Sequence, residues 1–267
     1  MVGKMIETIR IWCQKPYRNP QPKSTDELLQ RDFDLVKRAN TEIAIRNVPT
    51  GFQEVDLLSY LGLRQINERE ILKSMLEAEE KGFDAVVGLC FFDSAVRAAR
   101  SLMDIPVVGA AEASMHLARM MGNRFAVITS DPRFIPIIEN HMEELGTRPF
   151  AVSYRPIRHL TQGKSFFELR RSGDYGAIME DFTSVAQGCI EDGAEVLIPG
   201  SGALSPILSV NGIRDIEGAP IIDPVQVSLK FAEMMVDFRA SGMPVKSSRG
   251  LFLKPPKKDI FEGYKLL

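Results

Sequence analysis

The residues of this sequence that could do chemistry include three cysteines, Cys13, Cys90 and Cys189. A thiolate serves as a nucleophile or a base, and a helix N-terminus or a nearby cation lowers the pKa of a thiol. Cys90 follows an apolar run that begins at Asp84 and precedes a helical stretch, so we expect the helix to lower its pKa toward neutrality. A plain buried role stays open for Cys90. Cys189 lies inside a helical stretch and is interpreted as a core residue.

A glycine-flanked serine, Gly200-Ser201-Gly202, follows a second apolar run that ends at Pro199. Backbone N–H groups in such a turn can approach an anion closely, and a following helix adds its dipole. Pro199 stands where a hydrolase nucleophile elbow requires glycine, and Ser205 stands where a dinucleotide fingerprint has its third glycine. The turn therefore favours binding of a small anionic group, and a plain chain reversal is the alternative.

The three histidines, His116, His141 and His159, are far apart in the sequence and lack partners at metal-ligand spacing. We therefore expect no metal site. His159 follows Arg155 and Arg158 on a predicted loop, and this basic cluster could bind a carboxylate or lie solvated on the surface.

The composition is that of an ordinary globular protein: 267 residues, 45% hydrophobic, 25% charged and a formal net charge of -2. A near-neutral chain without clustered Lys and Arg lacks the basic patch that is typical of nucleic-acid-binding proteins. No apolar run approaches the ~20 residues that span a bilayer, and the N-terminal residues do not resemble a secretion signal. Three cysteines fit a reducing compartment. We expect a cytoplasmic protein that contacts neither nucleic acid nor membrane.

The elements that must position these residues alternate between short β-branched runs and helical stretches, which is typical of parallel sheets covered by helices. A Pro-rich turn is expected from Pro16 to Pro22, and Ser24 or Thr25 is expected to cap the next helix. The residues 165–173 are expected to form a loop or a short helix. The residues 242–267 are expected to form an arm over the surface, a subunit contact or a loose tail. Strands are predicted at 9–13, 42–46, 84–90, 106–109, 124–129, 151–155, 195–199 and 220–223, and helices from 24 and at 67–82, 94–103, 113–121, 134–145, 175–192 and 224–240.

Ligands of open parallel sheets bind at the carboxyl ends of the strands. Several candidate residues fall at such ends, namely Cys13, Cys90, Thr129, Ser130, the turn 200–202 and Asp223. The segments 81–90 and 191–201 share one pattern of helix end, glycine, acidic residue and apolar strand. This likeness indicates either that the chain has two related halves or that both segments follow the residue pattern common to all strand–helix–strand units.

The segment from Asp84 to Thr129 closely resembles hydantoin racemases. It contains, in order, Cys90-Phe-Phe-Asp93 after a strand, Ile105-Pro-Val-Val-Gly109, Glu112-Ala-Ser114 and Arg124-Phe-Ala-Val127. The segments 192–200 and 220–223 match as well, so the resemblance covers about 81–232. The chain is identified as a member of the aspartate/glutamate/hydantoin racemase family, which is similar to allantoin racemase, maleate isomerase and arylmalonate decarboxylase.

The resemblance implies an α/β fold of two Rossmann-like lobes with parallel sheets, related by a pseudo-twofold axis, with the active site in the cleft between them. The first lobe would comprise 1–115 plus 220–267, and the second 116–219. Members of the family use no cofactor. One cysteine from each half acts on opposite faces of an acidic carbon. Cys90 matches the first of these cysteines, whereas Ser201 stands in the place of the second.

This departure leaves three mechanisms open, because a serine hydroxyl is a poor acid–base group without a base beside it. Ser201 or another group relays a proton opposite Cys90; or Cys90 acts from one face alone, as a decarboxylase or isomerase does; or Cys90 attacks the substrate covalently. The substrate would be a small carboxylate or a cyclic amide such as a hydantoin. Cys90 and Ser201 are the expected catalytic residues, and the expected substrate-binding residues are Gln14, Phe91, Phe92, Thr129, Ser130, Gly200 and Gly202.

The segment after the first strand reads Cys13-Gln14-Lys15-Pro16, where the family carries an asparagine-rich stretch. Gln14 could replace an amide contact, and Lys15 would favour a more acidic substrate. We also expect a homo-oligomer. Two other functions stay open: a ligand-binding protein that has lost catalysis, and a cysteine hydrolase of a small amide.

Overall fold

A computed structural model of the chain describes residues 7–18, 23–161, 168, 170 and 172–253. The chain divides into two compact units. The first comprises Met1–Pro22, Lys37–Gly109 and Ser228–Leu267, and the second comprises Lys23–Val36 and Ala110–Val227. This division differs from the predicted lobes at 23–36, because helix α1 (Lys23–Asp34) packs on helix α8 (Ser205–Val210) of the second unit. It also differs at 110–115 and 220–227, which belong to the second unit. Each unit has a parallel sheet flanked by helices, which confirms the predicted α/β class.

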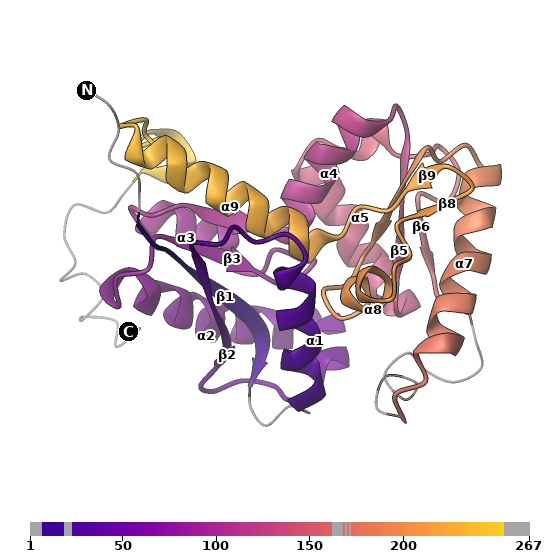
Figure 1. The fold of residues 1–267 in the computed structure, drawn as a ribbon, viewed down its shortest axis with the longest axis horizontal. Coiled ribbons are helices and arrows are strands. Elements are labelled where there is room, and N and C mark those ends of the chain that lie inside the picture. The colour runs from indigo at the N-terminus through magenta and orange to yellow at the C-terminus, as the bar shows by residue number, and fades with distance from the viewer. Residues whose placement is uncertain (1–6, 19–22, 162–167, 169, 171, 254–267) are drawn as a thin grey trace. The chain divides into compact units, whose positions relative to one another are not determined.

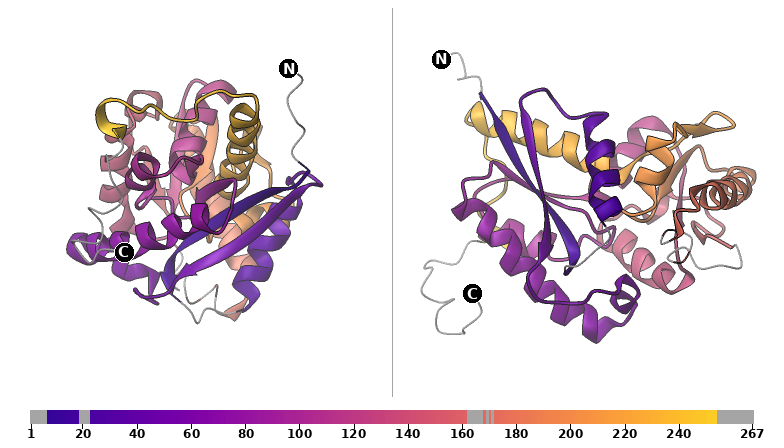
Figure 2. Two further views of the ribbon diagram at one scale, coloured as in Figure 1. Left: turned by 90° about the vertical axis from the view of Figure 1, so that its left-hand side faces the viewer. Right: turned by 60° about the horizontal axis from the view of Figure 1, so that its bottom comes forward.

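The first unit is built on a four-stranded parallel sheet in the order β2-β1-β3-β4. Helix α2 and the Ser228–Ala240 part of α9 lie on opposite faces of this sheet (Figures 1 and 2). Trp12 faces α2 and packs in a core with residues of α2 and α3, whereas Thr41 faces α9 and bonds to Glu233. The elements are β1 (Ile9–Arg18), η1 (Val55–Ser59), β2 (Thr41–Val48), α2 (Leu61–Glu80), β3 (Ala85–Gly88), α3 (Val96–Leu102), β4 (Val107–Gly109), α9 (Pro224–Ala240) and η4 (Gly250–Phe252).

The first strand is longer than predicted, because β1 runs through Pro16 to Arg18. The expected Pro-rich turn is therefore wrong over 16–18, and 19–22 lie outside the described residues. The register between β1 and β2 shifts between Gln14 and Arg18. A proline fits such an irregular stretch because its missing N–H breaks no regular ladder bond.

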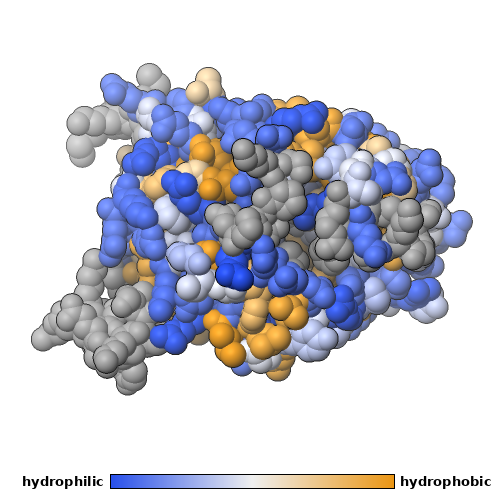
Figure 3. Space-filling view, turned by 90° about the horizontal axis from the view of Figure 1, so that it is seen from below, coloured by the Kyte–Doolittle hydropathy of each residue, from blue (hydrophilic) through white to orange (hydrophobic). Residues whose placement is uncertain are grey.

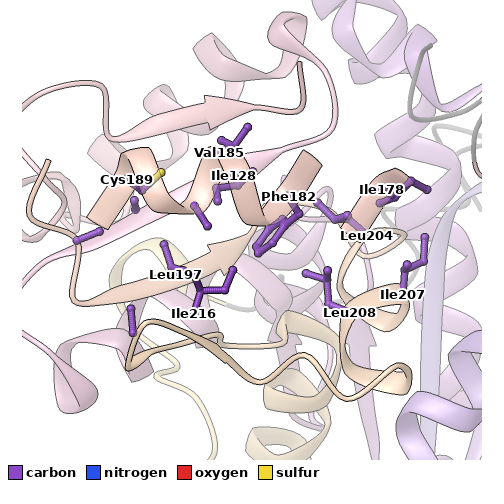
Figure 4. Packing of buried hydrophobic residues seen from close by; sticks show 14 of the residues in the cluster. Ile128, Ile178, Phe182, Val185, Cys189, Leu197, Leu204, Ile207, Leu208 and Ile216 are labelled. Atoms are coloured by element: carbon purple, nitrogen blue, oxygen red, sulfur yellow. The ribbon is translucent and has the colours of Figure 1, made fainter. Parts of the chain in front are cut away.

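The second unit is built on a parallel sheet in the order β6-β5-β7, which an isolated parallel bridge from Leu197 to Ile221 extends. Its core lies between this sheet and helices α7 and α8, with Phe182 near the middle of the cluster (Figure 4). The elements are α1, α4 (Ala110–Met121), β5 (Phe125–Thr129), η2 (Pro132–Phe134), α5 (Ile135–Glu144), η3 (Arg148–Phe150), β6 (Ile157–His159), α7 (Tyr175–Glu191), β7 (Val196–Pro199), α8, β8 (Asp215–Ile216) and β9 (Ala219–Pro220).

Two predicted strands of this unit are wrong. In the stretch 151–155 only Ala151 bridges to Phe125, and the strand is β6. Arg155 has a positive φ of 47° and Pro156 follows it, so an extended strand cannot run through this point. His159 therefore lies in a strand and not in the expected loop. The stretch 220–223 forms the end of the short antiparallel pair β8–β9 and then a single bridge.

The remaining predicted strands and helices are present, with ends that differ from the prediction by a few residues. Helix α9 has the predicted bounds, and α8 is the helix expected after the Gly-Ser-Gly turn, for which no bounds were predicted. Ser24 and Thr25 lie within the first turn of α1, which already begins at Lys23, so neither residue precedes the helix as its cap. The expected element at 165–173 lies mostly outside the described residues.

The two sheets share one connectivity. In each, the first strand lies at the centre, the second pairs on one side, the third on the other, and a fourth segment follows the third. The fourth segment is β4 in the first unit and Ile221 in the second. This shared order supports the prediction of two related halves, and the pseudo-twofold axis stays a prediction.

Hydrophilic residues cover most of the face shown in Figure 3, and hydrophobic residues form small groups between them. No helix in the described part of the chain is long and apolar enough to cross a membrane. Of the predicted tail, the part up to Leu253 lies on α3, where Lys246 donates to the carbonyl of Ser101 at 3.2 Å and Arg100 lies 5.7 Å from the centre of the Phe252 ring.

A buried pair of carboxyl groups holds α1 in the second unit. Asp32 of α1 accepts bonds from Ser209 of α8 and, at 2.6 Å, from Gln226. Ser209 also lies 2.7 Å from Asp223, whose other oxygen accepts the N–H of Val225 at 2.8 Å. Burial and the neighbouring Asp223 raise the pKa of Asp32 to about 8, and burial raises the pKa of Asp223. One of the two carboxyl groups therefore keeps a proton at neutral pH.

The substitution Asp32→Asn tests this pair. The pKa of Asp32 is near 4 in an unfolded chain and about 8 in the fold, so folding retains a proton, and stability falls as pH rises from about 4 to about 8. Asparagine carries no such proton. We expect Asp32→Asn to match the wild type near pH 4 and to be more stable by about 3–5 kcal/mol at pH 8.5, measured by urea unfolding. Asp34→Asn, at an exposed position of α1, serves as the control. Equal pH dependence of Asp32→Asn and wild type would contradict the shared proton.

Candidate active site

Cys90 lies two residues beyond the end of β3, at the carboxyl edge of the first unit's sheet. Strand β3 is paired on both sides, with β1 and with β4, and the N–H of Leu89 continues the ladder to the carbonyl of Gln14 at 2.9 Å. Cys90 is partly exposed, whereas Cys13 and Cys189 are buried. Of the three cysteines, Cys90 is therefore the one placed to meet a ligand.

The turn after Cys90 has an unusual backbone. Asp93 and Ala95 have positive φ angles of 47° and 63°, which are costly for residues other than glycine. The N–H of Asp93 donates to the carbonyl of Cys90 at 2.9 Å, and the N–H of Val96 donates to that of Asp93 at 3.0 Å. A Cβ atom on Gly109 would collide with the Asp93 carboxylate, so that carboxylate lies directly on the end of β4. The turn is fixed, and with it the position of Cys90.

Burial raises the pKa of the Cys90 thiol to about 11. The N–H of Phe92 and the hydroxyl of Ser94, whose oxygen is 3.8 Å from the sulfur, act in the opposite direction, and the charges of Asp93 and Glu68 raise the pKa further. The expectation of a pKa near neutrality is therefore wrong. Helix α3 begins only at Val96, and loss of hydration outweighs the dipole of this short helix. The resting thiol is protonated at neutral pH.

The other predicted residues of the first unit have different surroundings. Phe91 is buried and Phe92 half-buried, and the N–H of Phe92 is directed to the Cys90 sulfur. Gln14 is 1% exposed, and its amide bonds internally, accepting from Trp12 at 2.8 Å and from Ser74 at 2.7 Å. Its amide nitrogen donates to the carbonyl of Lys15 at 2.9 Å. Gln14 therefore braces the end of β1 against α2 and does not present its amide to a ligand.

Thr129 and Ser130 end strand β5 of the second unit, and both are buried. Neither hydroxyl has a hydrogen-bond partner among the described residues. Leaving a buried hydroxyl unpaired costs about 1–3 kcal/mol, and native structures rarely do so without a reason. Two such groups at the carboxyl end of one strand point to a ligand that supplies their partners.

The Gly-Ser-Gly turn lies beside them, because the N–H of Gly200 donates to the carbonyl of Ile128 at 2.7 Å. A Cβ at position 200 would come within 2.7 Å of a Val127 methyl group, so close packing of β7 on β5 requires this glycine. The Ser201 hydroxyl accepts the N–H of Ala203 at 3.2 Å and stabilises the turn into α8. No imidazole or carboxylate of the described residues bonds to this hydroxyl. Gly202 lies in the same turn and is half-buried.

The family model for Asp/Glu/Hydantoin racemase matches residues 22–232 of the chain. The chain belongs to this family. Among curated relatives, it is 30% identical to a hydantoin racemase of Pseudomonas sp. (strain NS671) over 193 residues, 72% of each chain. It is 27% identical to the hydantoin racemase of Rhizobium meliloti over 223 residues, 80% of this chain and 86% of that one. Among solved structures, allantoin racemase from Klebsiella pneumoniae superposes with a TM-score of 0.76 at 25% identity, covering 94% of this chain and 95% of that one.

These relatives make the chain an isomerase of the racemase type. The structure groups the predicted residues within each unit: Cys90, Phe91 and Phe92 in the first, and Thr129, Ser130 and the turn 200–202 in the second. Asp93 and Ser94 were not among the predicted site residues, although both lie in the matched motif and act on the position and charge of Cys90. The basic cluster does not stand free as a carboxylate site, because Arg158 pairs with Asp192.

Alkylation by iodoacetamide reports the ionisation of Cys90, because the thiolate is the form that reacts. With a pKa of about 11, modification of Cys90 is slow at pH 7 and accelerates about tenfold per pH unit up to about pH 10. Ser94→Ala removes a hydroxyl that favours the thiolate and slows the reaction at each pH. Mass spectrometry of tryptic peptides follows Cys90, with the buried Cys13 and Cys189 as internal controls. A rate that levels off near pH 7 would contradict the raised pKa.

Proposed function

We propose that this protein is a cofactor-independent racemase or epimerase of a hydantoin-like cyclic amide or small carboxylate, and that Cys90 moves the proton at the activated carbon. The observation that carries the proposal is the surroundings of Cys90. It is the partly exposed cysteine at the carboxyl edge of its sheet, in a strained turn, with a backbone N–H and a hydroxyl directed to its sulfur. Non-glycine strain of this kind is concentrated at functional sites.

The chemistry needs an acidic C–H beside a carbonyl. The Cys90 thiolate takes the proton, the electron pair of the C–H bond moves into the carbonyl to form an enolate, and return of a proton to the other face inverts the centre. A thiol of pKa about 11 is ionised in about one molecule in ten thousand at pH 7. The thiolate that acts as the base must therefore form after the substrate has bound. In the reverse sense, the protonated thiol is well suited to give its proton to the enolate.

The second unit would supply polar contacts. The unpaired hydroxyls of Thr129 and Ser130 would donate to a carbonyl or carboxylate oxygen of the substrate, where negative charge grows as the enolate forms. Ser201 would act at the opposite face, as the family resemblance implies. A lone hydroxyl removes a proton poorly, and this step would limit racemisation.

A second candidate is a one-face reaction, such as decarboxylation followed by protonation of the enolate. The protonated state of Cys90 favours it, because that reaction needs a proton donor and no base. A ligand-binding protein without catalysis and a cysteine hydrolase remain the contrasting functions. Against the hydrolase, no imidazole of the described residues bonds to Cys90, and its side-chain partner is Ser94.

Racemisation of single enantiomers of 5-substituted hydantoins and of allantoin, followed by polarimetry, tests the proposal, with a malonate decarboxylation assay alongside. We expect Cys90→Ala to lower the rate by about a thousandfold while leaving thermal unfolding unchanged. Cys189→Ala, in the core of the second unit, is the matched control and retains the rate.

Three results would contradict the proposal. Full activity of Cys90→Ala would remove this thiol from the mechanism. Hydrolysed product with an unchanged stereocentre would identify an amide hydrolase, and binding without turnover of any compound would identify a binding protein.

A further inference from the structure

Arg64 of helix α2 is half-buried and has one buried donor atom without an acceptor. Its Nη1 atom has no hydrogen-bond partner among the described residues, and its side chain is 17% exposed. Its Nε pairs with Glu68, one turn along the same helix, whose Oε1 lies 3.9 Å away. A guanidinium is always charged and presents its donors in a fixed planar fork. A buried fork with an unused donor suits an anion that arrives from solution.

The N-terminal half of α2 lies at the carboxyl edge of the first unit's sheet. Ser74 bonds to Gln14 at 2.7 Å, and Asn67, two turns nearer the start of α2, donates to the carbonyl of Pro16 at 2.7 Å. Residues nearer the N-terminus of α2 therefore lie beside residues nearer the C-terminal end of β1. Arg64 lies about one turn beyond Asn67, past the strand positions that these bonds mark.

Arg64 is connected to the candidate catalytic cysteine through Glu68. Glu68, its partner on α2, is close enough to the Cys90 sulfur for its charge to act on the thiol. A second cation, the 1% exposed Lys15, lies at the end of β1, with its Nζ 5.6 Å from the centre of the Tyr17 ring. The edge that holds Cys90 thus combines the basic side chains of Arg64 and Lys15 with the acids Glu68 and Asp93. Because these charges balance, the donor of Arg64 that has no acceptor is the feature that favours an anionic ligand.

We propose that Arg64 binds a carboxylate substituent of the substrate on which Cys90 acts, and so sets the substrate class as hydantoin-like compounds with an anionic side chain. This inference rests on the proposed function. The carboxylate would supply the acceptor that Nη1 lacks, in the two-bond geometry that guanidinium and carboxylate share. A neutral side chain of the same shape would leave the charge unpaired.

Two hydantoins of nearly equal shape test the inference, one with a 5-(2-carboxyethyl) and one with a 5-(2-carbamoylethyl) side chain. We expect the wild type to prefer the carboxylate in kcat/KM by roughly ten- to a hundredfold, the range for hydrogen bonds to charged groups. Arg64→Met should abolish the preference mainly through KM while keeping turnover of the amide, which also shows that the variant folds. Arg64→Lys should retain part of the preference, and Arg69→Met, an exposed arginine of the same helix, should retain all of it.

Calorimetric binding of both hydantoins to the Cys90→Ala protein separates this inference from the proposed function. Suppose that the carboxylate compound binds more tightly, that this difference is lost in Arg64→Met, and that the wild type turns over neither compound. This result would contradict the racemase proposal and support the role of Arg64. Racemisation of both compounds at equal rates, unaffected or equally lowered by Arg64→Met, would overturn the inference and leave the racemase intact.

Discussion

The position of Cys90 depends on the parallel pairing of β3 with strands on both sides. Pairing with β1 and β4 fixes the point along the sheet at which β3 ends. The N–H of Leu89 makes one more hydrogen bond to β1 before the chain turns. The Asp93 carboxylate, seated on Gly109 at the end of β4, then fixes the turn itself. The thiol is held at the edge of the sheet by a backbone that the two neighbouring strands determine.

The same enclosure gives the thiol its chemical character. Loss of hydration favours the neutral form, and the donors Phe92 and Ser94 offset this only in part. A thiol kept protonated at rest is a proton donor first and becomes a base only when the enclosure changes or the pH rises. In the second unit, the hydroxyls of Thr129 and Ser130 lack partners in the described part of the chain. The chemistry of the two units is therefore unequal although their sheets share one strand order.

Patterns in the sequence predicted the elements whose residues determine their own structure. The apolar run before Cys90 and the helix after Pro224 are present as predicted, because burial on both faces and helical periodicity are local signals. The failures have tertiary causes. Arg155 adopts a left-handed backbone that ends the predicted strand, and Gln14 is turned to Ser74 of a helix that begins some fifty residues later. The pKa of Cys90 depends on burial and on Glu68, and neither can be read from its neighbours in sequence. Arg64 gave no signal in sequence because a guanidinium nitrogen without an acceptor is recognised only once the fold has placed its surroundings.

The central claim is that Cys90 handles the proton at one face of the substrate carbon and that no second thiol serves the other. Incorporation of solvent deuterium into one enantiomer of a 5-substituted hydantoin, followed together with inversion, tests it most directly. The account predicts that the wild type incorporates deuterium with retention faster than it inverts the centre, that Cys90→Ala loses both rates, and that Ser201→Cys brings inversion up toward exchange. Deuterium incorporation by Cys90→Ala at the wild-type rate would contradict it.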